Sequence, residues 1–214
     1  MNKVIATFWS SNKSFILFIL LMAFFRGAIA DWNEVPSGSM KPTIIEGDRL
    51  WINKLAYDIK VPLTNLSLIS LSEPERGDIV IFESEKADER LVKRVIGLPG
   101  DKVAMINNKL IINNKALAYH PVENSTTDYY EQLGTVRHKI RVNPQGNTLS
   151  SFNTVIVPET KYLVLGDNRD NSADSRVIGF VSREEIVGRS RHVVISLDYD
   201  NYYMPRADRF LEML

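Results

Sequence analysis

The chain of 214 residues has no cysteine, only three histidines, and equal numbers of acidic and basic residues, 26 of each. Without cysteine there is no disulfide framework, no thiolate nucleophile and no cysteine-ligated zinc or iron–sulfur site. His120, His138 and His192 lack the paired spacing of a metal site, so we expect no metal or organic cofactor. A net charge of zero argues against a general nucleic-acid-binding protein.

Long apolar runs are also scarce, with one exception near the N-terminus. Residues 15–25 read Phe-Ile-Leu-Phe-Ile-Leu-Leu-Met-Ala-Phe-Phe, with Lys3 and Lys13 before them and Arg26 after them. The run is typical of three structures: a short transmembrane anchor, which normally needs ~20 apolar residues, a cleavable secretory signal ending in Ala-Ile-Ala at 28–30, or a buried helix. The two lysines weakly favour an orientation with the remainder of the chain outside the cytoplasm.

In the rest of the chain, turn residues separate short apolar runs, as is typical of a β protein. Pairs of asparagines at 107–108 and 113–114 predict back-to-back hairpins, because asparagine tolerates left-handed backbone angles. Helical signals are few: a Ser-x-x-Glu capping box at 182–185 and an apolar face over 206–214. Short β-branched or aromatic runs bounded by turn residues predict strands at 49–53, 78–82, 91–96, 109–112, 154–157, 162–165 and 191–195.

These patterns predict a mainly all-β fold of mixed antiparallel sheets with very few short helices, and they leave the N-terminal run open among the three structures above. We expect an N-terminal tail with the apolar segment at 1–30 and a β core built from 31–106 and 154–214. Residues 120–152 are polar with few apolar runs, so we interpret 107–153 as an insert or an extended hairpin region.

A first candidate for chemistry is the sequence Pro-Ser-Gly-Ser-Met-Lys-Pro at 36–42. A serine becomes a nucleophile when a base takes its proton and hydrogen-bond donors stabilise the oxyanion. Gly38 permits a tight backbone path that turns N–H groups and a second hydroxyl toward one point, and the prolines stiffen that path. Ser-Gly-Ser is also common in flexible loops, so the tripeptide alone does not establish a catalytic role.

The second candidate is Lys93, in the run Leu-Val-Lys-Arg-Val-Ile-Gly-Leu-Pro-Gly-Asp at 91–101. In a strand, Lys93 shares a face with Leu91 and Val95, while Arg94 points to the other face. An edge strand would leave this lysine in solvent. Burial would instead lower its pKa from ~10.4 toward neutrality, at a cost of roughly 4 kcal/mol, and the neutral amine would deprotonate a hydroxyl without a histidine.

The third candidate is the loop Gly-Asp-Asn-Arg-Asp-Asn-Ser-Ala-Asp-Ser-Arg at 166–176, directly after the strand predicted at 162–165. It lacks the central glycine and the closing glutamate of an EF-hand, so no calcium site is predicted. Asp–Arg pairs and Asx turns would brace such a loop, although a plain solvated turn also explains its composition.

Together and in this order, the three segments resemble the bacterial type I (leader) signal peptidases. The resemblance rests on Ser-Gly-Ser-Met-x-Pro at 37–42, the Lys-Arg-Val-Ile-Gly-Leu-Pro-Gly-Asp strand and turn at 93–101, and the loop at 166–176. Gly-Asp-Ile-Val-Ile-Phe at 77–82 and Gly-Phe-Val at 179–181 extend it. It implies a membrane-bound serine endopeptidase that removes signal peptides from exported preproteins after an Ala-x-Ala-like site.

The resemblance also assigns roles within these motifs. It makes Ser39 the nucleophile and Lys93 the neutral general base, and it places the oxyanion hole at the Ser39 N–H and the Ser37 hydroxyl. The supporting residues are then Ser172, which would hydrogen-bond to the Lys93 amine and orient it, the pair of Asp174 and Arg176, which would hold the loop, Met40 packed beneath the nucleophile, and Arg94 beside the base.

Members of the family keep an uncleaved anchor, so the resemblance implies one N-terminal transmembrane helix within the tail and membrane anchor at 1–30. It makes 31–106 and 154–214 the catalytic core of a single-pass protein of the bacterial inner membrane, with the catalytic domain on the periplasmic face. Its partners would be the signal-peptide c-regions of preproteins, the lipid bilayer and the secretion machinery nearby, with no nucleic acid. Many Gram-negative members have two anchors, whereas this chain has one short apolar segment, and self-cleavage at Ala30 stays open.

Two alternatives remain: a self-cleaving Ser–Lys regulator of the SOS-repressor kind, which the lack of a DNA-binding domain disfavours, and an inactive membrane-anchored binding domain.

Overall fold

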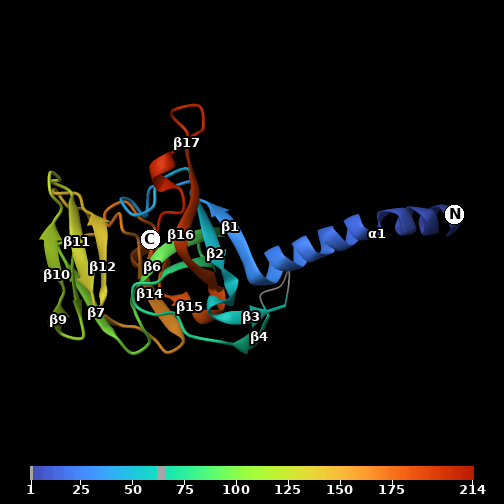
Figure 1. Cartoon of the computed structure of the whole chain (residues 1–214). Coiled ribbons are helices and arrows are strands. Elements are labelled where there is room, and N and C mark those ends of the chain that lie inside the picture. The colour runs from blue at the N-terminus through green and yellow to red at the C-terminus, as the bar shows by residue number, and fades with distance from the viewer. Residues whose placement is uncertain (1, 62–65) are drawn as a thin grey trace.

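The computed structural model describes residues 2–61 and 66–214, with side chains from residue 12 onward. These residues form a body of antiparallel β-sheets from which one long helix projects (Figure 1). The mainly all-β architecture with few helices is therefore confirmed. The other helical pieces are short: α2 (Ser175–Ile178), a π-helical segment at Phe25–Ile29, and 3-10 turns at Lys54–Ala56, Arg183–Glu185 and Ala207–Arg209.

The largest sheet has eight strands and contains the centre of the molecule. Its strand order is β1-β2-β16-β5-β6-β14-β15, and β17 pairs with β16 off this path. The strand β16, although late in the chain, therefore lies between β2 and β5. The bounds are β1 (Ala30–Glu34), β2 (Asp48–Asn53), β5 (Ile79–Ser84), β6 (Glu89–Gly97), β14 (Lys161–Leu165), β15 (Val181–Ser182), β16 (Ile186–Asp198) and β17 (Met204–Pro205).

Strand β6 lies inside this sheet, between β5 and β14, and both of its faces are covered. Leu91 and Val95 belong to one buried apolar cluster, while Ile96, on the other face, belongs to a second. Lys93 pairs with Val80 of β5 and shares the face of Leu91 and Val95, as the alternation of a strand requires. Lys93 is therefore enclosed by the sheet and is not on an edge strand.

Two smaller sheets form the end of the molecule farthest from the helix (Figure 1). The asparagine pairs at 107–108 and 113–114 all have positive φ angles of 48–65°, which confirms the predicted hairpin turns. One sheet has the order β10-β11-β12 and the other β13-β7-β8-β9, and a separate pair joins β3 to β4. The bounds are β3 (Asp58–Lys60), β4 (Ser67–Ser70), β7 (Lys102–Ile106), β8 (Lys109–Ile112), β9 (Lys115–Ala116), β10 (Ala118–Pro121), β11 (Asp128–Leu133), β12 (Val136–Arg141) and β13 (Phe152–Ile156).

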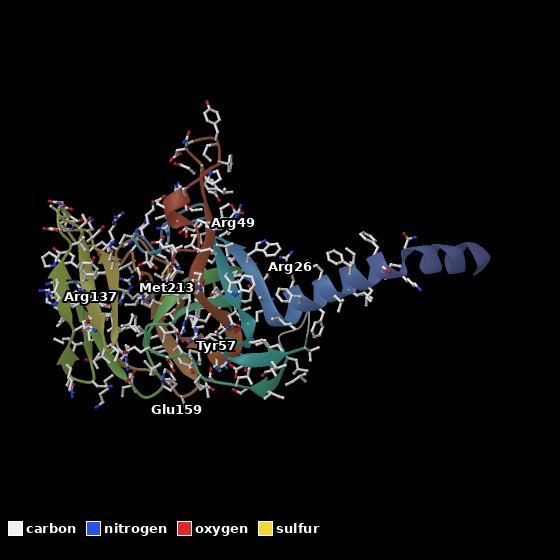
Figure 2. All side chains as sticks on the ribbon, in the orientation of Figure 1. Arg26, Arg49, Tyr57, Arg137, Glu159 and Met213 are labelled. Atoms are coloured by element: carbon white, nitrogen blue, oxygen red, sulfur yellow. The ribbon has the colours of Figure 1, made fainter. Side chains whose placement is uncertain are left out.

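The N-terminal helix α1 (Asn2–Phe24) contains residues 15–24 of the apolar run and extends away from the β body (Figures 1 and 2). The sequence predicted a transmembrane helix here. Among the residues that the structure describes, no helix combines the length and the apolar character that crossing a bilayer requires.

The helix expected over 206–214 is wrong. The tail contains only the 3-10 turn Ala207–Arg209, and its last residues bond to β16 through Val193 N to Glu212 O and Leu214 N to Arg191 O. Phe210 and Leu211 are exposed, so no continuous helical face is buried. Pairing with the backbone of β16 satisfies the tail's polar groups and takes the place of a helix.

Candidate active site

The first part of the candidate site is the turn that carries Ser39. Met40 and Ile44 are buried in an apolar cluster with Leu50, and the Ile44 N–H donates to the Met40 carbonyl at 3.0 Å. Ser39 is half-buried and Ser37 is exposed, with 3.5 Å between their Oγ atoms. The buried Met40 side chain, directly after Ser39, anchors the turn, and the hydroxyls of Ser37 and Ser39 stay accessible to a ligand.

The second part is Lys93, whose side chain reaches this turn from β6. Its Nζ donates to Ser39 Oγ at 2.9 Å and to the Val92 carbonyl at 3.1 Å. Lys93 is only 2% exposed. Burial disfavours the ammonium form and lowers the pKa of Lys93 to about 8, although Asp174, Glu89 and Asp167 act in the opposite direction. The accessible Ser39 hydroxyl and the desolvated Lys93 amine, 54 positions apart in the chain, are therefore in contact.

The third part is the loop after β14, which packs directly against the turn of Ser39. A Cβ on Gly166 would lie 2.4 Å from the Ser39 carbonyl oxygen and 2.3 Å from Ser172 Oγ, so only glycine permits this approach. The predicted hydrogen bond from Ser172 to the Lys93 amine is not formed. Ser172 is buried, and its Oγ has no hydrogen-bond partner within the described part of the chain. Ser172 therefore lies at the edge of the site without contacting the amine through a hydrogen bond.

The pair of Asp174 and Arg176 forms as the sequence analysis expected. Arg176 Nε and Nη2 donate to the two carboxylate oxygens of Asp174 at 2.8 and 2.6 Å. Asp174 Oδ2 also accepts the Gly166 N–H at 2.9 Å, and Arg176 Nη1 donates to the Leu149 carbonyl at 2.7 Å. A bidentate pair with such extra bonds ties both ends of the loop together and connects the loop to the 107–153 segment.

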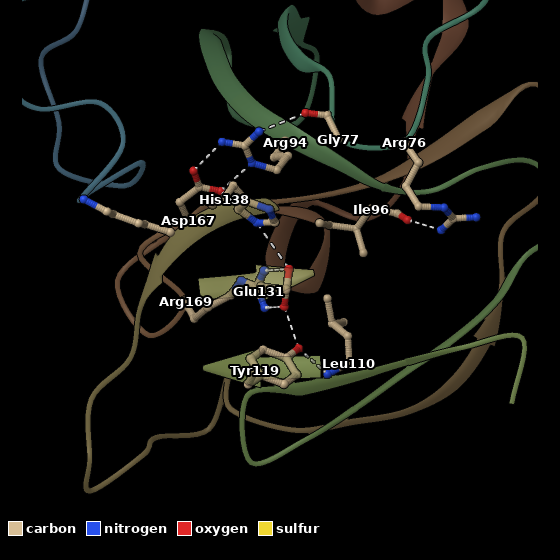
Figure 3. A network of polar contacts seen from close by, with 12 residues as sticks. Arg76, Gly77, Arg94, Ile96, Leu110, Tyr119, Glu131, His138, Asp167 and Arg169 are labelled. Atoms are coloured by element: carbon tan, nitrogen blue, oxygen red, sulfur yellow. Dashed lines mark hydrogen bonds and ion pairs between the residues drawn. The ribbon is translucent and has the colours of Figure 1, made fainter. Parts of the chain in front are cut away.

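Arg94, on the opposite face of β6 from Lys93, holds the start of the same loop (Figure 3). Its Nε and Nη2 donate to the carboxylate of Asp167 at 2.9 and 2.7 Å, and Nη1 donates to the Gly77 carbonyl at 2.9 Å. Burial alone would raise the pKa of Asp167, but the Arg94 guanidinium holds that pKa below its usual range. Thr43 Oγ1 adds a hydrogen bond to Asp167 at 2.6 Å, which links this pair to the turn of Ser39.

A second buried pair continues the network toward the small sheets (Figure 3). Arg169 donates to both oxygens of Glu131 on β11, at 2.9 and 2.6 Å. His138 of β12 lies 3.2 Å from Glu131 and 3.8 Å from Asp167. Burial and the nearby Arg94 charge lower the pKa of His138, although the Glu131 and Asp167 carboxylates act in the opposite direction. The residues on both sides of position 168 are therefore fixed by buried ion pairs.

The structure thus places the proposed residues of all three motifs around one point: Ser37, Ser39, Met40, Lys93, Ser172, Asp174 and Arg176, with Arg94 behind β6. Sequence reasoning assigned no partner to Arg94 and no role to Asn168, Glu131 or His138. Asp167 and Asn168 are within the loop motif that was singled out, but nothing in their local sequence indicated which distant groups they contact.

Residues 8–195 match the family described as signal peptidase, peptidase S26. The chain belongs to the signal peptidase family. It is accordingly a serine peptidase, and membership supports removal of signal peptides as its reaction.

Curated members of the signal peptidase family match over most of the chain. Signal peptidase I of Pseudomonas aeruginosa is 34% identical over 203 residues, covering 86% of this chain and 72% of that protein. That of Rickettsia bellii is 34% identical, with 91% and 75% covered. That of Buchnera aphidicola (subspecies Schizaphis graminum) is 31% identical, with 97% and 83% covered. The crystal structure of signal peptidase I from Enterococcus faecalis is 31% identical and covers 56% of this chain and 98% of its own, with a TM-score of 0.38.

Proposed function

We propose that this protein removes signal peptides from exported preproteins with a dyad of Ser39 as nucleophile and Lys93 as general base. The observation that carries the proposal is the 2.9 Å between Lys93 Nζ and Ser39 Oγ, together with the burial of Lys93 and its lowered pKa. A general base must lie within hydrogen-bond reach of the proton that it takes and must be neutral in a useful fraction of molecules. The 2.9 Å contact supports the first condition, and the lowered pKa of Lys93 supports the second.

The reaction would proceed in two steps. In the neutral form, the Lys93 amine accepts the Ser39 proton while Oγ attacks the scissile carbonyl, and the same amine then protonates the leaving nitrogen. Water hydrolyses the resulting ester, with Lys93 again as the base. The Ser39 N–H and the Ser37 hydroxyl, whose Oγ is 3.5 Å from Ser39 Oγ, would stabilise the oxyanion in both steps.

The substrate would be the stretch of a preprotein just after its apolar core, cut after an Ala-x-Ala-like site. An extended peptide gains affinity from main-chain hydrogen bonds and selectivity from pockets for alternate side chains. Small residues at the first and third positions before the cut fit this mode of binding.

Incubating the detergent-solubilised protein with a purified preprotein tests the dyad. We expect a shortened product from the wild type and a loss of at least ~1,000-fold in rate for Ser39→Ala and for Lys93→Ala, because nucleophile and base act as one unit. Lys102→Ala, which removes an exposed lysine of β7, is the matched control and should cleave normally.

Three outcomes would contradict this proposal. Turnover near the wild-type rate in either dyad variant, with folding confirmed by circular dichroism, would refute the Ser39–Lys93 assignment. A wild type that leaves every preprotein intact would favour an inactive binding domain. Cleavage of its own chain alone would favour a self-processing regulator.

We also propose that α1 associates the enzyme with a lipid bilayer. Leu17, Phe18, Leu20 and Leu21 are all more than half exposed, and the helix projects from the β body (Figure 2). Burying such side chains in lipid is favourable by roughly 25 cal/mol per Å² of apolar surface. A membrane-held enzyme would meet substrates tethered in the same bilayer at a raised local concentration.

A further inference from the structure

The Ser39 N–H can stabilise an oxyanion only if its peptide plane faces the correct way. Glycine before a residue leaves that plane free to rotate, because Gly38 has no Cβ to restrict its ψ angle. A flipped plane would present the Gly38 carbonyl oxygen to the substrate in place of the N–H. Something must therefore fix the Gly38–Ser39 peptide.

Asn168 contacts both peptide groups that flank Ser39. Its side-chain Nδ2 donates to the Gly38 carbonyl oxygen at 2.9 Å, and its backbone N–H donates to the Ser39 carbonyl oxygen at 3.0 Å. The Gly38 carbonyl also accepts the Lys41 N–H at 3.1 Å. That third bond closes the turn on itself, whereas the two bonds from Asn168 tie the turn to another part of the molecule.

Because the Gly38–Ser39 peptide is planar, these contacts also fix the direction in which the Ser39 N–H points. The Gly38–Ser39 peptide is trans, so its C=O and N–H point in opposite directions. Holding the Gly38 oxygen toward Asn168 therefore aims the Ser39 N–H away from Asn168. We infer that Asn168 is the positioning residue that aims the Ser39 N–H at the oxyanion, a role that presupposes the proposed Ser39–Lys93 mechanism.

Asn168 is itself held rigidly, as a positioning residue must be. Its neighbours Asp167 and Arg169 are buried and form the ion pairs with Arg94 and Glu131. Their backbones bracket Arg141 at the end of β12: the Arg141 N–H donates to the Asp167 carbonyl and the Arg169 N–H to the Arg141 carbonyl, both at 2.8 Å. The three-stranded sheet thus supports the residue that orients the catalytic turn.

The test is steady-state cleavage of a preprotein by Asn168→Ala and Asn168→Asp. Both remove the Nδ2 donor, keep the backbone N–H and leave the buried neighbours unchanged; the aspartate also keeps the shape of the side chain. We expect kcat to fall roughly 10- to 100-fold with KM unchanged, somewhat less than the loss of a whole oxyanion donor. Asn171→Ala, an exposed asparagine of the same loop, is the control and should keep the wild-type kcat.

Two further readouts separate this role from a merely structural one. First, Ser37→Ala combined with Asn168→Ala should lose less activity than the product of the two single losses, because both act on one oxyanion. Second, the apparent pKa that governs kcat/KM should be the same in Asn168→Ala as in the wild type, because Asn168 acts on the oxyanion donor and not on Lys93.

Several results would overturn the inference. They are an unchanged kcat in Asn168→Ala, a change confined to KM, fully multiplicative losses with Ser37→Ala, or a shifted pH profile. If Asn168→Asp unfolds, Asn168→Ala alone decides. Failure of the Ser39–Lys93 mechanism gives a different result, because Ser39→Ala would then still cleave the preprotein. The Asn168 variants are compared only with an active wild type.

Discussion

Ser39 and Lys93 differ in what surrounds them, although their reactive atoms are 2.9 Å apart. Ser39 is open enough to meet a substrate, whereas Lys93 is almost completely enclosed by the sheet. Exposure of the lysine would restore its ordinary pKa and leave very little free amine at neutral pH. With a pKa of about 8, roughly one molecule in ten has a neutral Lys93 at pH 7.

This titration predicts the pH dependence of cleavage. Because the lowered pKa of Lys93 is about 8 and the neutral amine is the proposed base, kcat/KM should rise about tenfold per pH unit below pH 8 and level off above it. The measurement is kcat/KM from pH 5.5 to 9.5, with thermal unfolding followed over the same range as the control. A profile that stays flat down to pH 5.5, or an inflection near pH 10, would contradict a desolvated lysine base.

At the scale of elements, β6 contributes to the site from both of its faces. Lys93 reaches Ser39 on one face, and Arg94 holds Asp167 and hence the 166–176 loop on the other. The same strand also has an exposed pair, Arg90 with Glu83 of β5 at 2.5 Å. One strand therefore offers a buried and a solvent-exposed arginine–carboxylate pair for direct comparison.

We expect Arg94→Met to lower the free energy of unfolding by about 3 kcal/mol or more, because the Asp167 carboxylate would stay buried without its partner. Arg90→Met should lower it by less than about 1 kcal/mol, since solvent screens that pair. Urea unfolding at pH 7 measures both, and cleavage assays should show a larger loss of activity for Arg94→Met. Equal effects of the two substitutions would show that the Arg94–Asp167 pair does not hold the loop.

Sequence patterns predicted the elements whose signals are local. The strand at 91–96 and the turn at 113–114 depend on short-range alternation and on asparagine's tolerance of positive φ, and both are confirmed. The helix predicted at 206–214 was wrong because the tail hydrogen-bonds to β16. The local apolar pattern that suggested a helix carries no information about that tertiary contact. Site motifs were visible in the sequence, but the partners of Arg94 and Asn168 depend on tertiary contacts across 73 and 130 positions.

At the scale of the whole molecule, the apolar helix and the small sheets lie at opposite ends of the β body (Figure 1). Lipid contact at α1 would therefore leave β10–β12 away from the bilayer surface. Exposed Trp32 and Trp51, on the strands that follow α1, would extend the contact toward the catalytic turn. Tryptophan is favoured at such membrane interfaces because one end of its ring system is apolar and the N–H is polar.

Flotation with vesicles of phosphatidylcholine and phosphatidylglycerol measures this contact. The wild type should float with the vesicles, and Leu17→Asp combined with Leu20→Asp should lower the bound fraction at least about tenfold, because charged groups are costly in the hydrocarbon region. Ile156→Asp, an exposed apolar residue of β13, is the control and should bind as the wild type does. Unchanged flotation of the α1 variant would show that this helix is not the lipid-binding element.

The position of β16 has a consequence for when the enzyme becomes active during its synthesis. The turn of Ser39 leads into β2, Lys93 is on β6 beside β5, and β16 is inserted between β2 and β5. Until residues 186–198 have left the ribosome and paired with both neighbours, the two halves of the sheet have no shared strand to hold hydroxyl and amine together. We therefore expect a nascent chain to lack cleavage activity until β16 pairs with both neighbours and closes the sheet.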